Sequence, residues 1–174
     1  VSSYSVTELG VADKMSRILL KNPLISDESV ILDGMACVGG NTISFCRNFN
    51  QVYCVEIDSV RFDYLNSNLR VLGLENVTSY NGSILDYYKN IKSDILFLDP
   101  EWGGPDYDMK KKINVYINNI AINEFCKMIM DSISPPKVIS LKLPKNYDLD
   151  LLKNNIDRKI EIFDLKKMFL VNIY

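Results

Sequence analysis

The nine residues Asp99–Tyr107 read DPEWGGPDY and combine side chains suited to chemistry on a flat, nitrogen-containing ring. They follow the apolar run Asp94–Leu98, which has the length and composition of a buried strand. Asp99 and the carbonyl of Pro100 offer two acceptors that can orient a conjugated amine, a poor nucleophile, for in-line attack on an electrophile. The sequence therefore predicts an α/β enzyme whose substrate loop lies where a strand ends.

Trp102 is the only tryptophan of the chain and lies two residues after Pro100. An indole at this point can stack on a base, and such a stack contributes about 1–3 kcal/mol. A buried core position is the alternative role for this side chain. Gly103 and Gly104 disfavour the core role, because a buried anchor rarely needs two permissive residues beside it. We therefore expect Trp102 to contact the substrate.

A second set of candidates follows the first predicted strand. Gly39 and Gly40 permit a tight turn before a helix, and the free amides at the start of that helix can hold a ligand. Glu56 ends the next strand about twenty residues on, where a carboxylate accepts the hydroxyl groups of an adenosine ribose. Neither G-x-G-x-x-G nor the lysine of a phosphate loop is present. These residues favour S-adenosylmethionine, which carries no phosphate and whose ammonium group Asp33 can attract.

Strand and helix patterns alternate along the chain and define the elements that must position these residues. Strands are predicted at 30–32, 52–57, 77–80, 94–98 and 137–143, and helices at about 6–21, 41–49, 59–72, 84–90, 118–132 and 148–155. Residues 159–164 and 168–174 are predicted to form an antiparallel hairpin. The fold class is therefore α/β: a doubly wound, seven-stranded, mainly parallel sheet with helices on both faces and a C-terminal antiparallel hairpin.

The length of 174 residues fits one domain over 1–174, and the start at Val1 rather than Met indicates a domain excised from a longer chain. The formal net charge of −2 excludes a broad basic face that wraps a long stretch of nucleic acid. Contact with a short or terminal piece of RNA stays open. Lysines gather at 110–112, at 142 and 145, and at 166 and 167, either as phosphate contacts or as ordinary solvated surface.

The four cysteines show no C-x-x-C spacing, and the chain has no histidine, so we expect no metal site. Nothing in the sequence resembles a signal peptide or a membrane span. The cysteines are therefore expected to be free thiols of an intracellular protein in a reducing compartment, the nucleus or the cytoplasm.

The chain resembles the trimethylguanosine synthases, Rossmann-like enzymes that use S-adenosylmethionine to methylate the exocyclic 2-amino group of 7-methylguanosine at RNA caps. The resemblance covers almost the whole chain, and a fourth, weaker stretch joins three strong ones. These stretches are Tyr4-Ser5-Val6-Thr7, Asp33 through Val38-Gly39-Gly40-Asn41-Thr42, Asp99-Pro100 through Trp102-Gly103-Gly104-Pro105-Asp106-Tyr107, and the weaker Leu143-Pro144-Lys145-Asn146.

The resemblance implies a role for each matching residue. The catalytic set is Asp99, Pro100 and Trp102; the cofactor set is Thr7, Asp33, Gly39, Gly40, Asn41, Thr42, Glu56, Ser83 and Asp99; the substrate set is Pro100, Trp102, Tyr107, Lys145 and Asn146. A 7-methylguanine ring is cationic, so stacking on Trp102 gains a cation–π contribution of about 0.5–2 kcal/mol. Lys145, with Lys142 or the 110–112 run, is expected to hold the cap triphosphate.

Three positions depart from the family pattern. Glu101 stands where the family has a second proline, Cys37 replaces the first glycine of the cofactor turn, and Ser83 replaces an aspartate that contacts the adenine amine. Asp86 is the candidate substitute for that aspartate. The family's active domains also carry a helical extension before the first motif, and this chain starts almost at that motif.

The predicted partner is 7-methylguanosine-capped RNA or the cap nucleotide, bound by a monomer, with no DNA and no membrane. Two alternatives stay open. One is an amino methyltransferase that acts on an internal guanine of RNA or an adenine of DNA, and the extension that contains Trp102 disfavours it. The other is a non-catalytic cap-binding module that lost the cofactor through Cys37 and Ser83.

Overall fold

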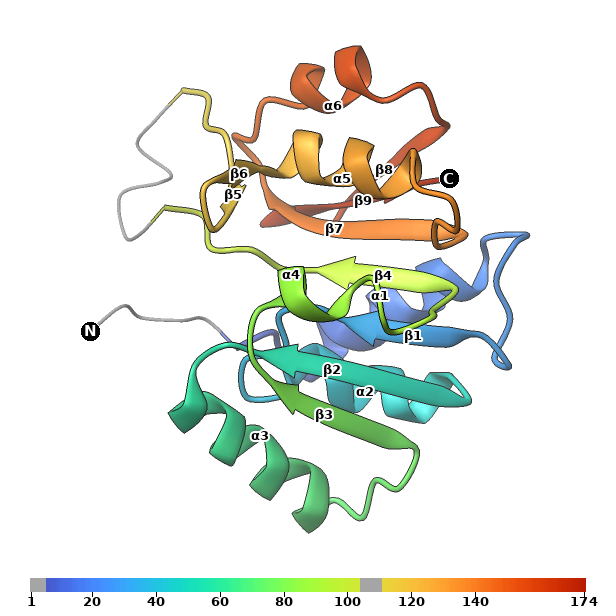
Figure 1. Cartoon of the computed structure of the whole chain (residues 1–174), viewed down its shortest axis with the longest axis vertical. Coiled ribbons are helices and arrows are strands. Elements are labelled where there is room, and N and C mark those ends of the chain that lie inside the picture. Colours follow the sequence, from blue (N-terminus) through green and yellow to red (C-terminus); the bar gives the residue numbers. More distant parts are fainter. Residues whose placement is uncertain (1–5, 104–110) are drawn as a thin grey trace. The chain divides into compact units, whose positions relative to one another are not determined.

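The computed structural model describes residues 6–103 and 111–174 (Figure 1), and the chain divides into two compact units. The first unit, Ser5–Leu98, alternates helices and strands. Its helices are α1 (Leu9–Leu20), α2 (Gly40–Asn48), α3 (Ser59–Val71) and α4 (Ile84–Tyr87); its strands are β1 (Val30–Asp33), β2 (Gln51–Glu56), β3 (Val77–Asn81) and β4 (Ile95–Leu98). β1 pairs in parallel with β2 and β4, and β2 pairs in parallel with β3.

An apolar interior holds the strands of this unit in place. All four residues of β4 are buried, as expected for a strand covered on both faces. Phe97 of β4 packs edge-on against Phe45 of α2, with ring centroids 5.0 Å apart. Leu65 and Leu69 of α3 cluster with Cys54 of β2. In Figure 1, α4 lies on the near side of these strands, and α1 and α2 lie on the far side.

The second unit contains Asp99–Tyr174 and ends in antiparallel strands. Its elements are β5 (Tyr116–Ile117), β6 (Ile120–Ala121), α5 (Ile122–Met130), β7 (Val138–Pro144), α6 (Asp150–Asn155), β8 (Ile160–Asp164) and β9 (Met168–Ile173). β9 pairs antiparallel with both β7 and β8, while β5 and β6 form a separate two-stranded sheet. All seven residues of β7 are buried, which makes β7 the rigid centre of this unit.

The seven strands of the main sheet follow the order β3-β2-β1-β4-β7-β9-β8, with β9 reversed. The predicted fold class is therefore confirmed, including the C-terminal hairpin of β8 and β9. Every predicted strand is present, with ends that differ by at most one residue.

Two predicted helix starts are wrong. The helix predicted at 118–132 begins only at Ile122, because Asn118 and Asn119 form the turn of the β5–β6 hairpin. Asn118 has a φ of 52°, a conformation that asparagine tolerates better than most residues. The helix predicted from residue 6 begins at Leu9, and Glu8 caps it without a side-chain hydrogen bond.

Candidate active site

The predicted cofactor turn is the connection from β1 to α2. Asp33 is the last residue of β1, and its side chain is fully buried. The hydroxyl of Thr42, in the first turn of α2, donates to Asp33 Oδ2 at 2.7 Å. A buried carboxylate needs such a donor, because leaving water without one costs several kcal/mol. The structure thus joins two of the predicted cofactor residues directly.

Glycine is required at the start of α2 for close backbone approach. Gly39 caps the helix with a φ of 101°, which lies in the left-handed region. A Cβ on Gly40 would lie 3.0 Å from the carbonyl oxygen of Thr7 and 3.2 Å from its amide nitrogen. The segment that carries Thr7 is therefore packed against the beginning of α2, where Asn41 is also buried. Thr7, Gly39, Gly40, Asn41 and Thr42 therefore lie together at one turn, and their contact with the cofactor stays a prediction.

Cys37 occupies a backbone conformation that normally belongs to glycine. Its φ is 52°, and in this region a residue with a Cβ loses about 1–2 kcal/mol relative to right-handed backbone. The turn therefore keeps the shape expected for the family's glycine, with a local strain. The backbone amide of Cys37 donates to Glu56 Oε2 at 2.8 Å, which ties this turn to the end of β2.

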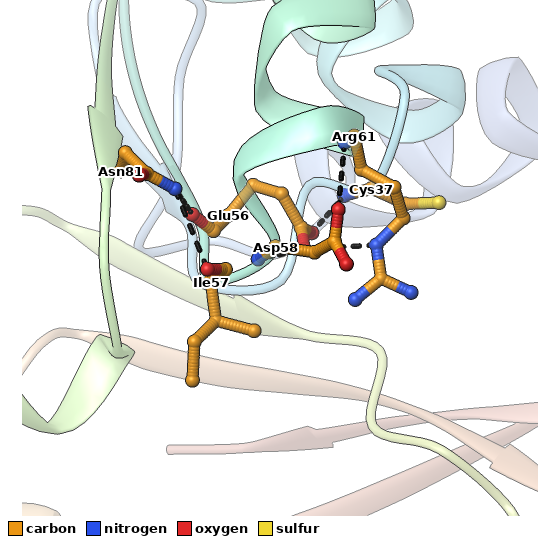
Figure 2. A network of polar contacts seen from close by, with 6 residues as sticks. All are labelled: Cys37, Glu56, Ile57, Asp58, Arg61 and Asn81. Atoms are coloured by element: carbon orange, nitrogen blue, oxygen red, sulfur yellow. Dashed lines mark hydrogen bonds and ion pairs between the residues drawn. The ribbon is translucent and has the colours of Figure 1, made fainter.

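Figure 2 shows the contacts of Glu56, the predicted ribose acceptor. Its side chain is buried at the end of β2, and Oε1 accepts from the amide of Asp58 at 2.9 Å and from Arg61 Nε at 3.0 Å. With the Cys37 amide on Oε2, three donors occupy a carboxylate that has about four acceptor positions. Asn81 Nδ2 donates to the backbone carbonyl of Glu56 at 2.8 Å and fixes the strand end.

Arg61 and Asn81 were missed by the sequence reasoning. Arg61 lies in the first turn of α3, where Asp58 accepts its backbone amide at 2.8 Å and caps the helix. An arginine five positions after a candidate acidic ligand was the available signal. A ribose bound at Glu56, as predicted, would have to share the carboxylate with the Arg61 guanidinium or displace it.

Ser83 and Asp86 lie at the start of α4. The hydroxyl of Ser83 accepts from the amide of Leu85 at 3.2 Å and caps the helix. Asp86 is exposed in the first turn of the same helix. Ser83 therefore has a structural role of its own, and its contact with the cofactor stays a prediction.

The substrate half is organised by Lys142 of β7. Its ammonium group donates to Asp99 Oδ2 at 2.7 Å, and the side chain of Lys142 is only 4% exposed. The indole Nε1 of Trp102 donates to the backbone carbonyl of Lys142 at 3.4 Å, and the ammonium lies 5.5 Å from the centroid of the indole ring. Pro100, which lies between Asp99 and Trp102 in the sequence, is buried. Trp102 itself is half-buried, so it is not a core residue.

The expected role of Lys142 in phosphate binding is wrong, because its ammonium is buried and pairs with Asp99. Lys145 is exposed, pairs with Asp164 and lies 4.3 Å from the ring centroid of Phe169. Asn146 follows in the same turn, where its carbonyl accepts from the amide of Ile113 at 2.9 Å.

Other predicted contacts lie at the edge of the described residues or beyond them. Lys112 is exposed and pairs with Asp148 at 2.9 Å and Asp150 at 3.6 Å, so a phosphate must compete with these carboxylates for it. Tyr107 lies outside the described residues, as does the rest of the extension from 104 to 107 and Lys110.

Three of the four free cysteines are buried. Burial, and to a lesser extent the Asp33 carboxylate, raises the pKa of the Cys46 thiol to about 12. Burial likewise raises the pKa of Cys54 and Cys126 far above the ordinary value. Within residues 6–103 and 111–174, no three His, Cys, Asp or Glu side chains gather in a way that would hold a metal ion. No helix in these ranges has the length and apolar character needed to cross a bilayer.

This sheet and these helices define the class as a Rossmann-like methyltransferase fold. The structure of an RNA methyltransferase from Salinibacter ruber in complex with S-adenosyl-L-homocysteine aligns with a TM-score of 0.67. The alignment covers 95% of this chain and 90% of that chain at 14% identity. At 14% sequence identity, this likeness shows a shared fold and nothing further.

The family follows from sequence comparison. The model of the family RNA cap guanine-N2 methyltransferase matches residues 28–170, so the chain belongs to this family. An uncharacterized protein of Acanthamoeba polyphaga mimivirus is 32% identical over 82% of this chain, and the trimethylguanosine synthase of Schizosaccharomyces pombe is 30% identical over 85%. The matches cover 57% and 62% of those relatives, so the chain spans about three fifths of their length. The resemblance drawn from the motifs is confirmed.

Replacing Cys37 by glycine should stabilise the protein. Glycine adopts the φ of 52° without the cost of a Cβ, so Cys37→Gly is expected to raise the free energy of unfolding by about 1 kcal/mol in denaturant titrations. Cys37→Ala is the matched control, because it removes the thiol and keeps the Cβ. Equal stability of the glycine and alanine variants would contradict the strain at this turn.

Replacing Glu56 by glutamine should weaken binding of S-adenosylmethionine. The amide offers one acceptor oxygen in place of two and loses its charge, so we expect the dissociation constant to rise about tenfold or more, measured by calorimetry. Glu75→Gln, at an exposed carboxylate of the same unit, should leave it unchanged. An unaltered affinity in Glu56→Gln would remove Glu56 from the cofactor site.

Proposed function

We propose that this chain transfers a methyl group from S-adenosylmethionine to the exocyclic 2-amino group of 7-methylguanosine at an RNA 5′ cap. The observation that carries the proposal is the contact set of Asp99, Trp102 and Lys142, in a chain of the RNA cap guanine-N2 methyltransferase family. We further propose that residues 1–174 work as one catalytic domain and act as a monomer.

The residues of the β1–α2 turn fit a cofactor without phosphates. Asp33 and Glu56 are both carboxylates, which suit an ammonium group and ribose hydroxyls and repel phosphate. Gly40 lets the backbone of Thr7 pack closely against the start of α2, so both segments reach this turn. Thr7, Asn41, Thr42 and Ser83 are assigned to the same ligand. S-adenosylmethionine would supply an electrophilic methyl group on a sulfonium.

Asp99 and Pro100 would hold the amine. The lone pair of an exocyclic amine is delocalised into the ring, and hydrogen bonds from its N–H groups to the Asp99 carboxylate and the Pro100 carbonyl orient the remaining lone pair for attack. Because Lys142 occupies Asp99 Oδ2, the carboxylate acts chiefly as a fixed acceptor. We rank this positioning above proton abstraction by Asp99.

Trp102 would select the methylated base. Its indole N–H is used by the carbonyl of Lys142, which fixes one edge of the ring, and the Lys142 ammonium lies over the ring, so we assign the stack to the opposite face. A cationic 7-methylguanine gains about 0.5–2 kcal/mol over neutral guanine on such a face. Glu101, exposed next to Trp102, adds a negative charge that suits a cationic base.

Few groups would hold the rest of the cap. Lys145 is exposed directly after β7, and Asn146 and Tyr107 are assigned to the same ligand. Release of Lys145 from Asp164 would free its charge for the triphosphate. A grip on one end of the RNA agrees with a net charge of −2. The thiols of the four free cysteines support an intracellular, reducing location, nuclear or cytoplasmic.

The decisive test compares two caps. Labelled S-adenosylmethionine is offered with 7-methylguanosine-capped RNA and with unmethylated guanosine-capped RNA, and the cap is analysed by mass spectrometry. We expect label on the 2-amino group of the first cap and about fivefold or more slower labelling of the second, which corresponds to about 1 kcal/mol of cation–π selectivity. Label on an internal base would establish the alternative amino methyltransferase. Equal labelling of both caps would refute the selection by Trp102.

Removing the indole should separate cap binding from cofactor binding. Trp102→Ala is expected to weaken binding of 7-methylguanosine triphosphate about thirtyfold, from the loss of about 2 kcal/mol of stacking, while calorimetry finds the affinity for S-adenosylmethionine unchanged. Trp102→Phe should retain part of the affinity. Cap binding that survives in the alanine variant would count against the stack.

A non-catalytic cap-binding module is the second candidate, and the occupied state of Glu56 favours it. Three donors already fill most of that carboxylate, which leaves a ribose few acceptors unless Arg61 moves. Calorimetry with S-adenosylmethionine separates the two functions. No binding at millimolar cofactor, with retained affinity for 7-methylguanosine triphosphate, would establish the binding module.

A further inference from the structure

Lys142 is a buried cation that the proposed reaction does not by itself require. It lies in the middle of β7, is 3% exposed, and pairs in antiparallel register with Leu170 of β9. A buried ammonium is costly, and an ion pair of this kind contributes little net stability compared with apolar side chains of similar volume. Its contacts with Asp99 and Trp102 therefore call for a functional explanation.

We propose that Lys142 is the positioning residue of the methyl transfer: its side chain fixes the Asp99 carboxylate and its backbone carbonyl fixes the Trp102 indole. This inference rests on the proposed function and deepens it. The two effects come from different atoms of one residue. The ammonium reaches Asp99 Oδ2 at 2.7 Å, and the carbonyl accepts from Trp102 Nε1 at 3.4 Å.

The placement of Lys142 on β7 makes this arrangement rigid. All residues of β7 are buried, and ladder hydrogen bonds to β9 run along its length. Two residues earlier on the same face, the hydroxyl of Ser140 donates to Asn172 Oδ1 at 2.8 Å, so the polar side chains of this face are themselves held. A loop residue such as Asp99 gains a fixed orientation when its partner stands on such a strand.

The positive charge also limits what Asp99 does. An ammonium at 2.7 Å occupies one oxygen of the carboxylate and fixes the direction of the group. A carboxylate held in this way presents its acceptor positions to an amine in a defined orientation. The amine is therefore bound in a set direction, and misplacement by about 1 Å costs on the order of a hundredfold in rate.

A side-chain substitution at position 142 separates the two effects, because every variant keeps the backbone carbonyl. We expect Lys142→Met to lower kcat about 10- to 100-fold on 7-methylguanosine-capped RNA. The calorimetric dissociation constants of 7-methylguanosine triphosphate and of S-adenosylmethionine should change less than about twofold, since the carbonyl that anchors Trp102 remains and a methionine side chain can replace the contact of the ammonium with the indole ring. Lys142→Arg should recover part of kcat. Lys137→Met, at an exposed lysine next to β7, is the matched control and should leave kcat and both constants unchanged.

A double-mutant cycle shows whether Lys142 acts through Asp99. Asp99→Asn removes the acid, and in that background Lys142→Met should have little further effect on kcat. The double variant carries neither charge, so it avoids an unpaired buried ion and keeps the comparison available if Lys142→Met alone does not fold. A kcat that falls by the same factor in both backgrounds would overturn the role through Asp99.

The remaining outcomes distinguish this inference from the function on which it rests. If the unaltered protein transfers no methyl group to capped RNA, the proposed function fails and the role of Lys142 fails with it. If the unaltered protein is active and Lys142→Met retains its kcat, the function stands and the positioning role alone is wrong. A cap affinity that collapses in Lys142→Met with kcat unchanged would instead assign Lys142 to binding and also overturn the proposal.

Discussion

A carboxylate taken out of water must have donors, and this requirement organises the candidate site residues within each of the two units. The Asp33 carboxylate accepts a hydrogen bond from the hydroxyl of Thr42, and the Glu56 carboxylate accepts hydrogen bonds from two backbone amides and from Arg61. The Asp99 carboxylate accepts a hydrogen bond from the ammonium group of Lys142. Each acid stands at or directly after the carboxyl end of a strand, where a parallel sheet leaves loops free to carry function. The donors set the direction of each acid and limit how many further hydrogen bonds it accepts.

The strands and most helices could be predicted from the sequence because they depend on local apolar patterns. β4 is a continuous apolar run, β7 is apolar except for Ser140 and Lys142, and both strands are fully buried. The predicted start of α5 is wrong because Asn118 and Asn119 fit a turn as well as a helix. The pairing of β5 with β6 selects the turn, in which Asn118 has a positive φ. The local apolar pattern alone does not show whether the turn or the helix is the more stable structure at these two residues.

The site residues were predictable by type, but their partners were not. Lys142 is separated from Asp99 by 43 positions, and in the sequence it looks like one member of a basic pair with Lys145. Burial assigns the two lysines opposite roles: Lys142 is enclosed with an acid and Lys145 is exposed beside Asp164. The strained φ of Cys37 is likewise invisible in its residue type, since only its place in a glycine turn gives a signal.

The same requirement bears on how an acidic chain would bind a charged ligand. Lys112 and Lys145 already pair with carboxylates at the surface, where such pairs are worth about 0–1 kcal/mol and exchange readily. A triphosphate, with more charge than one carboxylate, can take over these lysines at little cost. Lys142 cannot be exchanged in this way, because leaving Asp99 would strand a buried ammonium. An exposed lysine can thus exchange its surface carboxylate for an anionic ligand, while the enclosed Lys142 stays paired with Asp99, so burial distinguishes the binding role proposed for Lys145 from the positioning role proposed for Lys142.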